Sequence, residues 1–164
     1  MVRSTLAPLA VAMSLALAGC QRSEDATPEG NGEQAASTEA PLAKTASDGT
    51  LQWAACPPVF PAGCEMAVLH GDPAKPNADV FLRVPAGYAI PAHTHSSAER
   101  MILVTGKLDV KYQGAQPVTL SPGSYAYGPA RLPHKATCMA AEACTLFIAF
   151  EGPVDVESFE GAVG

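Results

Sequence analysis

Residues 87–106 read GYAIPAHTHSSAERMILVTG and carry the clearest structural signal in the sequence. His93 and His95 are two residues apart, so in an extended chain both imidazoles point to the same face, about 7 Å apart. Glu99 and Met101 have the same parity, and they share this face if the chain stays extended through Ser96-Ser97-Ala98. The stretch would then present two imidazoles and a carboxylate together, which are donors suited to a divalent metal.

The sequence around this stretch consists of short apolar or alternating runs that are separated by glycine and proline. No window supports a helix of three turns, and many short strands with intervening turn residues are typical of antiparallel sandwiches and barrels. We therefore predict an all-β domain over residues 51–164, built as one small jelly-roll barrel. The predicted strands are Glu65–Leu69, Val80–Val84, Met101–Val104, Lys107–Tyr112, Pro117–Leu120, Ser124–Tyr127, His134–Cys138 and Cys144–Phe150.

The spacing of the charged and turn residues resembles that of the cupin superfamily. Residues 87–106 match its first motif, G-x5-H-x-H-x3-E-x6-G, at each fixed position. The second motif, G-x5-P-x-G-x2-H-x3-N, follows from Gly123. It keeps the proline and the histidine, which is His134, whereas Arg131 and Cys138 stand where the family has glycine and asparagine.

This resemblance covers about residues 51–151. Residues 66–73 and 83–88 are also similar to small bacterial cupins, a group that includes domains like the cupin half of zinc-binding anti-sigma factors. The resemblance implies a double-stranded β-helix that holds one divalent transition metal, Fe, Mn, Ni, Cu or Zn. Four protein ligands would leave two octahedral positions open for a substrate. The implied ligands are His93, His95, Glu99 and His134.

Cupins with this ligand set include dioxygenases, oxalate oxidases, decarboxylases and sugar isomerases, but also sensors and storage proteins, so the fold does not determine the chemistry. We favour a metal-dependent enzyme of the dioxygenase, oxidoreductase or isomerase type that acts on a small molecule. A noncatalytic metal- or metabolite-binding or sensing module remains the alternative, because no residue is clearly a separate general base. The substrate-pocket candidates are Met101, Arg83, Tyr125 and Tyr127, whereas His70 is expected to face solvent.

The composition argues against a macromolecular charged partner. The chain has 164 residues, of which 48% are apolar and 16% charged, and its formal net charge is −6 with no basic cluster. Nucleic acid is therefore not expected as a partner, and no apolar run approaches the roughly 18 residues of a spanning helix. The apolar runs Met101–Val104 and Leu146–Phe150 leave a homodimer interface open.

The first fifty residues are expected to form an export signal followed by a disordered tether. Residues 1–19 have a positive start and an apolar stretch, as export signals do. The ending Leu17-Ala18-Gly19-Cys20 resembles the lipobox of bacterial lipoproteins, which implies lipidation of Cys20 with palmitate-type acyl chains and anchoring to the envelope, facing the periplasm. Gln21 favours the outer membrane if the host is Gram-negative. Residues 20–50 are polar and should form a disordered linker.

The remaining cysteines, Cys56, Cys64, Cys138 and Cys144, form an even set, and in an exported protein we expect disulfides. Four cysteines allow three pairings. Residues 139–143 could form a hairpin turn that sets Cys138 opposite Cys144, which would leave Cys56 to pair with Cys64. A redox switch at Cys138, near the predicted metal site, is the alternative to purely structural bridges.

Overall fold

A computed structural model describes residues 39–139 and 142–164. The predicted signal peptide, the lipidated Cys20 and most of the predicted tether lie outside these residues. The end of the tether is described, and residues 45–51 form two successive turns there, with the Asp48 amide donating to Thr45 and the Leu51 amide donating to Asp48. The described residues contain no helix that could cross a membrane.

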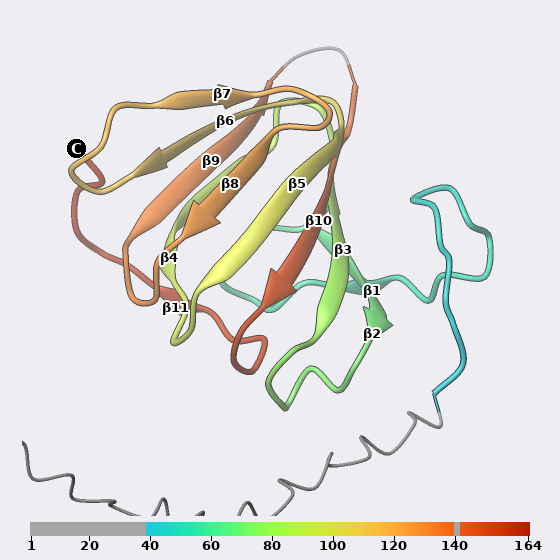
Figure 1. Ribbon diagram of the computed structural model, residues 1–164. Helices are drawn as coiled ribbons and strands as arrows, with labels where there is room; N and C mark the ends of the chain where they lie inside the picture. Colours follow the sequence, from blue (N-terminus) through green and yellow to red (C-terminus); the bar gives the residue numbers. More distant parts are fainter. Residues whose placement is uncertain (1–38, 140–141) are drawn as a thin grey trace, which may run out of the picture. The chain divides into compact units, whose positions relative to one another are not determined.

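The described chain is built of short strands, which confirms the all-β prediction (Figure 1). The strands form two antiparallel sheets, with the order β1-β2-β3-β10-β5-β8 in one and β11-β4-β9-β6-β7 in the other. The sheets face each other as the jelly-roll barrel that the sequence predicts. The strand bounds are β1 Ala54–Ala55, β2 Glu65–His70, β3 Asp79–Val84, β4 Ala89–Thr94, β5 Glu99–Thr105, β6 Lys107–Tyr112, β7 Val118–Leu120, β8 Tyr125–Gly128, β9 His134–Met139, β10 Cys144–Phe150 and β11 Glu157–Ser158.

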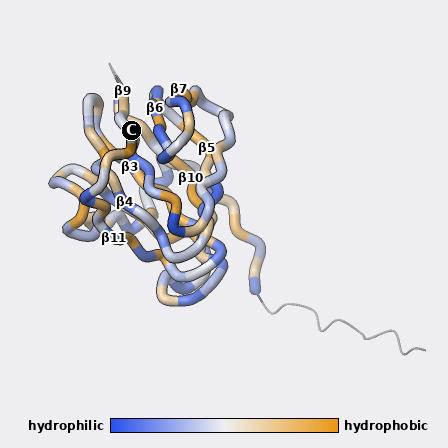
Figure 2. The backbone as a smooth tube through the Cα atoms, turned by 90° about the vertical axis from the view of Figure 1, so that its left-hand side faces the viewer, coloured by the Kyte–Doolittle hydropathy of each residue, from blue (hydrophilic) through white to orange (hydrophobic). Residues whose placement is uncertain are grey.

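The core lies between the two sheets and follows from alternation along the strands. In β9, His134, Ala136 and Cys138 are buried, while the residues between them are exposed. Orange and blue segments accordingly alternate along the tube in Figure 2. Strands β9 and β5 thus place one face in the barrel and the other in solvent, as expected for a half-buried sheet, whereas β3 and β10 have no exposed residue.

Strand β4 carries His93 and is followed directly by His95, but it is absent from the strands predicted from the sequence. Pro91 lies in its middle, and proline normally occurs only at edges or bulges of a sheet because it has no N–H to donate. The structure accommodates it by a register shift between Ile90 and His93 in the pairing of β4 with β9. The pairing resumes with His93 opposite His134, which brings the two cupin motifs together.

Two disulfides close short loops of the barrel. Cys56 is joined to Cys64 at the neck of the loop between β1 and β2. Cys138 is joined to Cys144, but these residues are not partners in a hairpin, since β9 belongs to the five-stranded sheet and β10 to the six-stranded sheet. The expected hairpin is wrong because β9 pairs with β4 and β6 instead. This disulfide therefore links the two sheets.

Candidate metal centre

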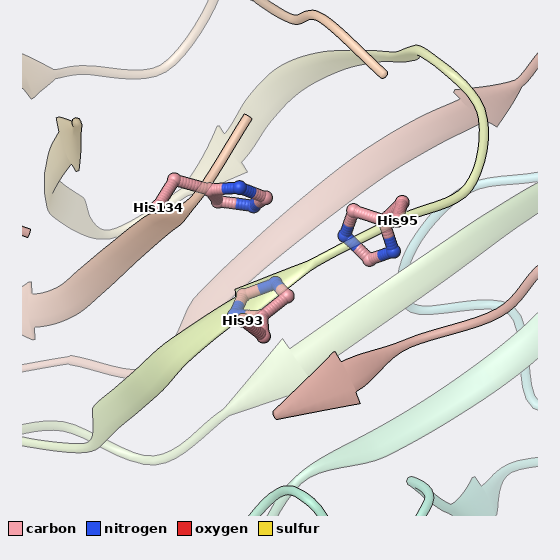
Figure 3. A group of neighbouring side chains, drawn as sticks. All are labelled: His93, His95 and His134. Atoms are coloured by element: carbon pink, nitrogen blue, oxygen red, sulfur yellow. The ribbon is translucent and has the colours of Figure 1, made fainter. Parts of the chain in front are cut away.

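The three histidines of the two motifs converge inside the barrel (Figure 3). His93 ends the pairing of β4 with β9, His95 directly follows β4, and His134 is the first residue of β9. One ring nitrogen from each lies within 4.8 Å of the others. All three are buried, with at most 8% of their surface exposed. The structure thus brings together, from two distant segments, the imidazoles expected to share one site.

Each imidazole is held through its Nδ1 by a backbone carbonyl. His93 Nδ1 donates to Pro91 at 2.7 Å, His134 Nδ1 donates to Leu132 at 3.1 Å, and His95 Nδ1 donates to Asp155. A carbonyl can only accept, so Nδ1 carries the hydrogen and the neutral ring keeps its lone pair on Nε2. Metal-bound histidines in proteins are commonly held in this way by a partner on the other nitrogen.

Glu99, the first residue of β5, completes the cluster. Its Oε1 lies 3.1 Å from His134 Nε2 and its Oε2 lies 3.5 Å from His95 Nε2. The carboxylate is buried, yet Oε1 has no hydrogen-bond partner. A carboxylate oxygen facing a nitrogen lone pair is unfavourable unless a proton or a cation lies between them. The unsatisfied oxygen therefore fits a site that binds a cation.

The pKa values of the four groups follow from burial and mutual charge. Burial, together with the neighbouring His134, lowers the pKa of His93 to about 4, so this ring is neutral at pH 7. Burial disfavours charge on Glu99 and His134 as well, but their attraction outweighs it. The pKa of Glu99 is therefore lowered and that of His134 raised. Three imidazoles and one carboxylate are a donor set that Mn(II), Fe(II), Ni(II), Cu(II) and Zn(II) accept.

Gly128 leaves the space that the Glu99 side chain occupies. The two residues are opposite each other in the pairing of β5 with β8. A Cβ on Gly128 would lie 2.9 Å from both Cγ and Oε1 of Glu99, closer than nonbonded atoms approach. The carboxylate is therefore positioned against a backbone that only glycine leaves free, a requirement that neither motif predicts.

The four side chains lie at the wall of a cavity inside the barrel. The centre of a water molecule can reach about 70 Å³ of this cavity. By the same measure, one water needs about 10–15 Å³. Most of the lining is aliphatic or aromatic and comes from both sheets, from the loop after β1 and from the segment before β11. It includes Cys56, Phe60, Met66, Met101, Phe150 and Val154. The cavity can therefore take a few waters or one small molecule.

Of the proposed pocket residues, only Met101 lines this cavity. Tyr125 and Tyr127 alternate with Ala126 and Gly128 on β8, and they take the solvent side with 58% and 48% of their surface exposed. Arg83 pairs with Glu65 at 2.7 Å and lies over the Trp53 ring, with its guanidinium carbon 3.9 Å from the ring centre. The structure places these three side chains on the outside of the barrel.

Three residues near the site were not singled out from the sequence. Phe60 places its ring edge-on to His93, with 5.2 Å between ring centres. Asp155 accepts from His95 through its carbonyl and from the Ser96 amide through its carboxylate. The buried hydroxyl of Tyr112, whose ring lies 5.3 Å from that of His134, has no hydrogen-bond partner. Phe60 and Asp155 lie outside both motifs, so no spacing could have indicated them.

Comparisons with known proteins agree with this architecture. The DMSP lyase DddQ from Ruegeria pomeroyi DSS-3 is similar in structure, with a TM-score of 0.58 and 21% identity over 68% of this chain and 64% of that chain. An RmlC-like cupin from Shewanella frigidimarina NCIMB 400 has a TM-score of 0.54 and 18% identity over 65% of this chain and 86% of that one. The match thus spans less than two thirds of the length of the lyase, and identities this low show the fold alone.

No curated protein matches the sequence. Residues 43–155, more than half of the chain, match the ChrR cupin-like domain. The protein belongs to this family of cupins.

Proposed function

We propose that this protein binds one divalent transition metal through His93, His95, Glu99 and His134 and is a metal-dependent enzyme acting on a small molecule. The unsatisfied Oε1 of Glu99 carries this proposal, because it faces the free Nε2 of His134 in a buried site. A bound cation would satisfy both atoms at once. In the metal-free chain, only a shared proton could do so.

The metal would supply Lewis acidity, and a redox-active ion could also supply electrons for oxygen chemistry. The chain's own contribution is positioning and exclusion of water. The carbonyls of Pro91, Leu132 and Asp155 fix the three rings, while Gly128 gives room to Glu99. The apolar lining keeps bulk water away from the four donors, which strengthens their electrostatic interaction with a substrate.

A second function, noncatalytic sensing of a metal or metabolite, is favoured by one observation. Apart from the four proposed ligands, Asp155 is the one ionisable residue among the described side chains that line the cavity. Its carboxylate already accepts a hydrogen bond from the Ser96 amide. An enzyme that needs a separate general base would have to use this group or a proposed metal ligand, whereas a sensor needs neither.

Elemental mass spectrometry of the full-length protein tests the metal site. We expect about one equivalent of a transition metal in the native protein and none in the His93→Ala/His134→Ala double variant. His70→Ala is the matched control, because His70 is the fourth histidine and lies outside the cluster. Equal metal in the double variant, or none in native protein after reconstitution, contradicts the proposal. Turnover that is lost with the metal in His95→Ala separates an enzyme from a sensor.

We also propose that the mature protein is anchored to the cell envelope through lipidated Cys20 and faces the periplasm. The ending Leu17-Ala18-Gly19-Cys20 supports this, and the two disulfides suit an oxidising compartment. Mass spectrometry of the N-terminal peptide should find Cys20 as the first residue with acyl chains attached. Cys20→Ala should release the protein from the membrane fraction, and retention there contradicts the anchor.

A further inference from the structure

We propose that the loop closed by the Cys56–Cys64 disulfide is the selectivity wall of the metal cavity, and that it admits small ligands with one coordinating head group and an uncharged, apolar body. This inference rests on the proposed metal site. It adds the class of ligand and the chain segment that selects it.

The loop is rigidly held at both ends. At its neck the disulfide is reinforced by the Cys56 amide, which donates to the Cys64 carbonyl at 3.0 Å. At its far end the Tyr88 hydroxyl donates to the Pro61 carbonyl at 2.5 Å. Between these points the Phe60 amide donates to Pro57, which closes a turn. The three prolines of residues 56–64 further limit the backbone.

This rigid loop faces the metal donors. Cys56, Pro57 and Phe60 all line the cavity. The Phe60 ring meets the His93 ring edge-on, at an interplanar angle of 79°. A change in the loop would therefore alter the cavity directly beside a proposed ligand, without altering the barrel strands that hold the other three.

The rest of the lining has no side chain that could pair with a second anionic group on the ligand. No lysine or arginine within residues 39–139 and 142–164 lines the cavity. The carboxylate of Asp155 would repel an anion. A second carboxylate on a ligand would thus be buried without a partner, which is strongly unfavourable. The polar atoms of the ligand must be those that reach the metal, and the remainder must match the aliphatic and aromatic wall.

The full-length protein loaded with Co(II) tests this inference, because the visible spectrum of Co(II) responds to a ligand that enters its coordination sphere. Butyrate and succinate are the probes, since both have four carbons and they differ by the second carboxylate. We expect butyrate to bind at least tenfold more tightly than succinate. In Phe60→Ala and in Cys56→Ala/Cys64→Ala, water should enter beside His93 and the preference should fall to about twofold.

Two controls isolate the loop. Phe60→Leu keeps an apolar wall and should keep the preference, and Cys138→Ala/Cys144→Ala removes a disulfide that does not line the cavity. Equal affinities in the native protein, no spectral response to butyrate, or an unchanged preference in both loop variants overturns this inference while the metal site stands. If elemental analysis finds no bound cobalt, the proposed function fails and the inference fails with it.

Discussion

The two disulfide loops look alike in the sequence and differ in what they do. Their cysteines are eight and six residues apart. The Cys56–Cys64 loop belongs to a hairpin of one sheet and lines the cavity. Cys138 and Cys144 are fully buried and join the two sheets. One disulfide thus closes a loop that shapes the cavity, and the other holds the two sheets together.

Strand β9 connects the proposed metal site with the Cys138–Cys144 disulfide. His134 is its first residue, and Cys138 follows four residues later, about 13 Å along an extended strand. Both side chains point inward because they have the same parity. The separation is large enough that a change at one end should leave the other nearly unaffected, since mutational effects more than about 7–10 Å apart are usually additive.

The largest effect should come from Glu99→Gln at the cavity end. The amide is neutral, and its NH2 group can donate to the lone pair on His134 Nε2, so the cluster no longer needs a cation. Metal affinity should fall by more than about 100-fold, beyond the 10–100-fold typical of losing a partner of a ligand. Glu65→Gln is the control, because Glu65 pairs with Arg83 outside the barrel. Titration of both variants with Zn(II) measures the difference, and equal affinities would refute the role of Glu99.

The second prediction removes each disulfide in turn. Loops of this length contribute about 2–2.5 kcal/mol each by chain-entropy reasoning. Cys138→Ala/Cys144→Ala and Cys56→Ala/Cys64→Ala should therefore lose similar free energies of unfolding in urea. Only the second should alter ligand preference at the metal. Metal loss or altered preference in the first variant would show that the Cys138–Cys144 disulfide and the metal site are coupled.

The metal site and the Cys138–Cys144 disulfide also show what can be predicted from the sequence. Motif spacing groups His93, His95, Glu99 and His134 as the structure does. The expectation that the chain stays extended from His95 to Glu99 is wrong, because it bends at Ser96-Ser97 and Glu99 lies on β5, in the other sheet from β4. Alternation shows that Tyr125 and Tyr127 share one face of β8, but it does not show whether that face points into the barrel or into solvent. The Cys138–Cys144 hairpin failed because sequence proximity does not say whether the chain stays in one sheet.

Residues that act through distant contacts were beyond local reasoning. Phe60 reaches His93 from the loop between β1 and β2, and Asp155 reaches His95 across 60 positions of sequence. The missing Cβ of Gly128 matters only because Glu99 lies opposite it. Such pairs depend on strand register, which the sequence alone did not supply.

A third prediction concerns that space. Gly128→Ala should displace the Glu99 carboxylate, because the added carbon would lie 2.9 Å from Cγ and Oε1. Overpacking of this kind costs about 1–3 kcal/mol, so we expect about a tenfold loss of metal affinity. Gly49→Ala is the control, since no atom lies within 4 Å of the added carbon there. Isothermal titration with Zn(II) measures both, and an undiminished affinity in Gly128→Ala contradicts the account of Glu99.

The smallest effect is expected at Arg131, beside the cavity end, where the cupin pattern has glycine. Its φ is +61°, and its amide donates to the His95 carbonyl at 2.8 Å, so the turn keeps the left-handed conformation without the glycine. This conformation costs a residue with a side chain about 1–2 kcal/mol, whereas glycine loses about 0.5–1 kcal/mol more chain entropy on folding. Arg131→Gly should therefore raise the free energy of unfolding by about 0.5 kcal/mol. Arg131→Ala retains Cβ and should gain nothing. An equal gain in both variants would assign the cost to the arginine side chain, and a loss in both would assign that side chain a stabilising contact at the cavity end.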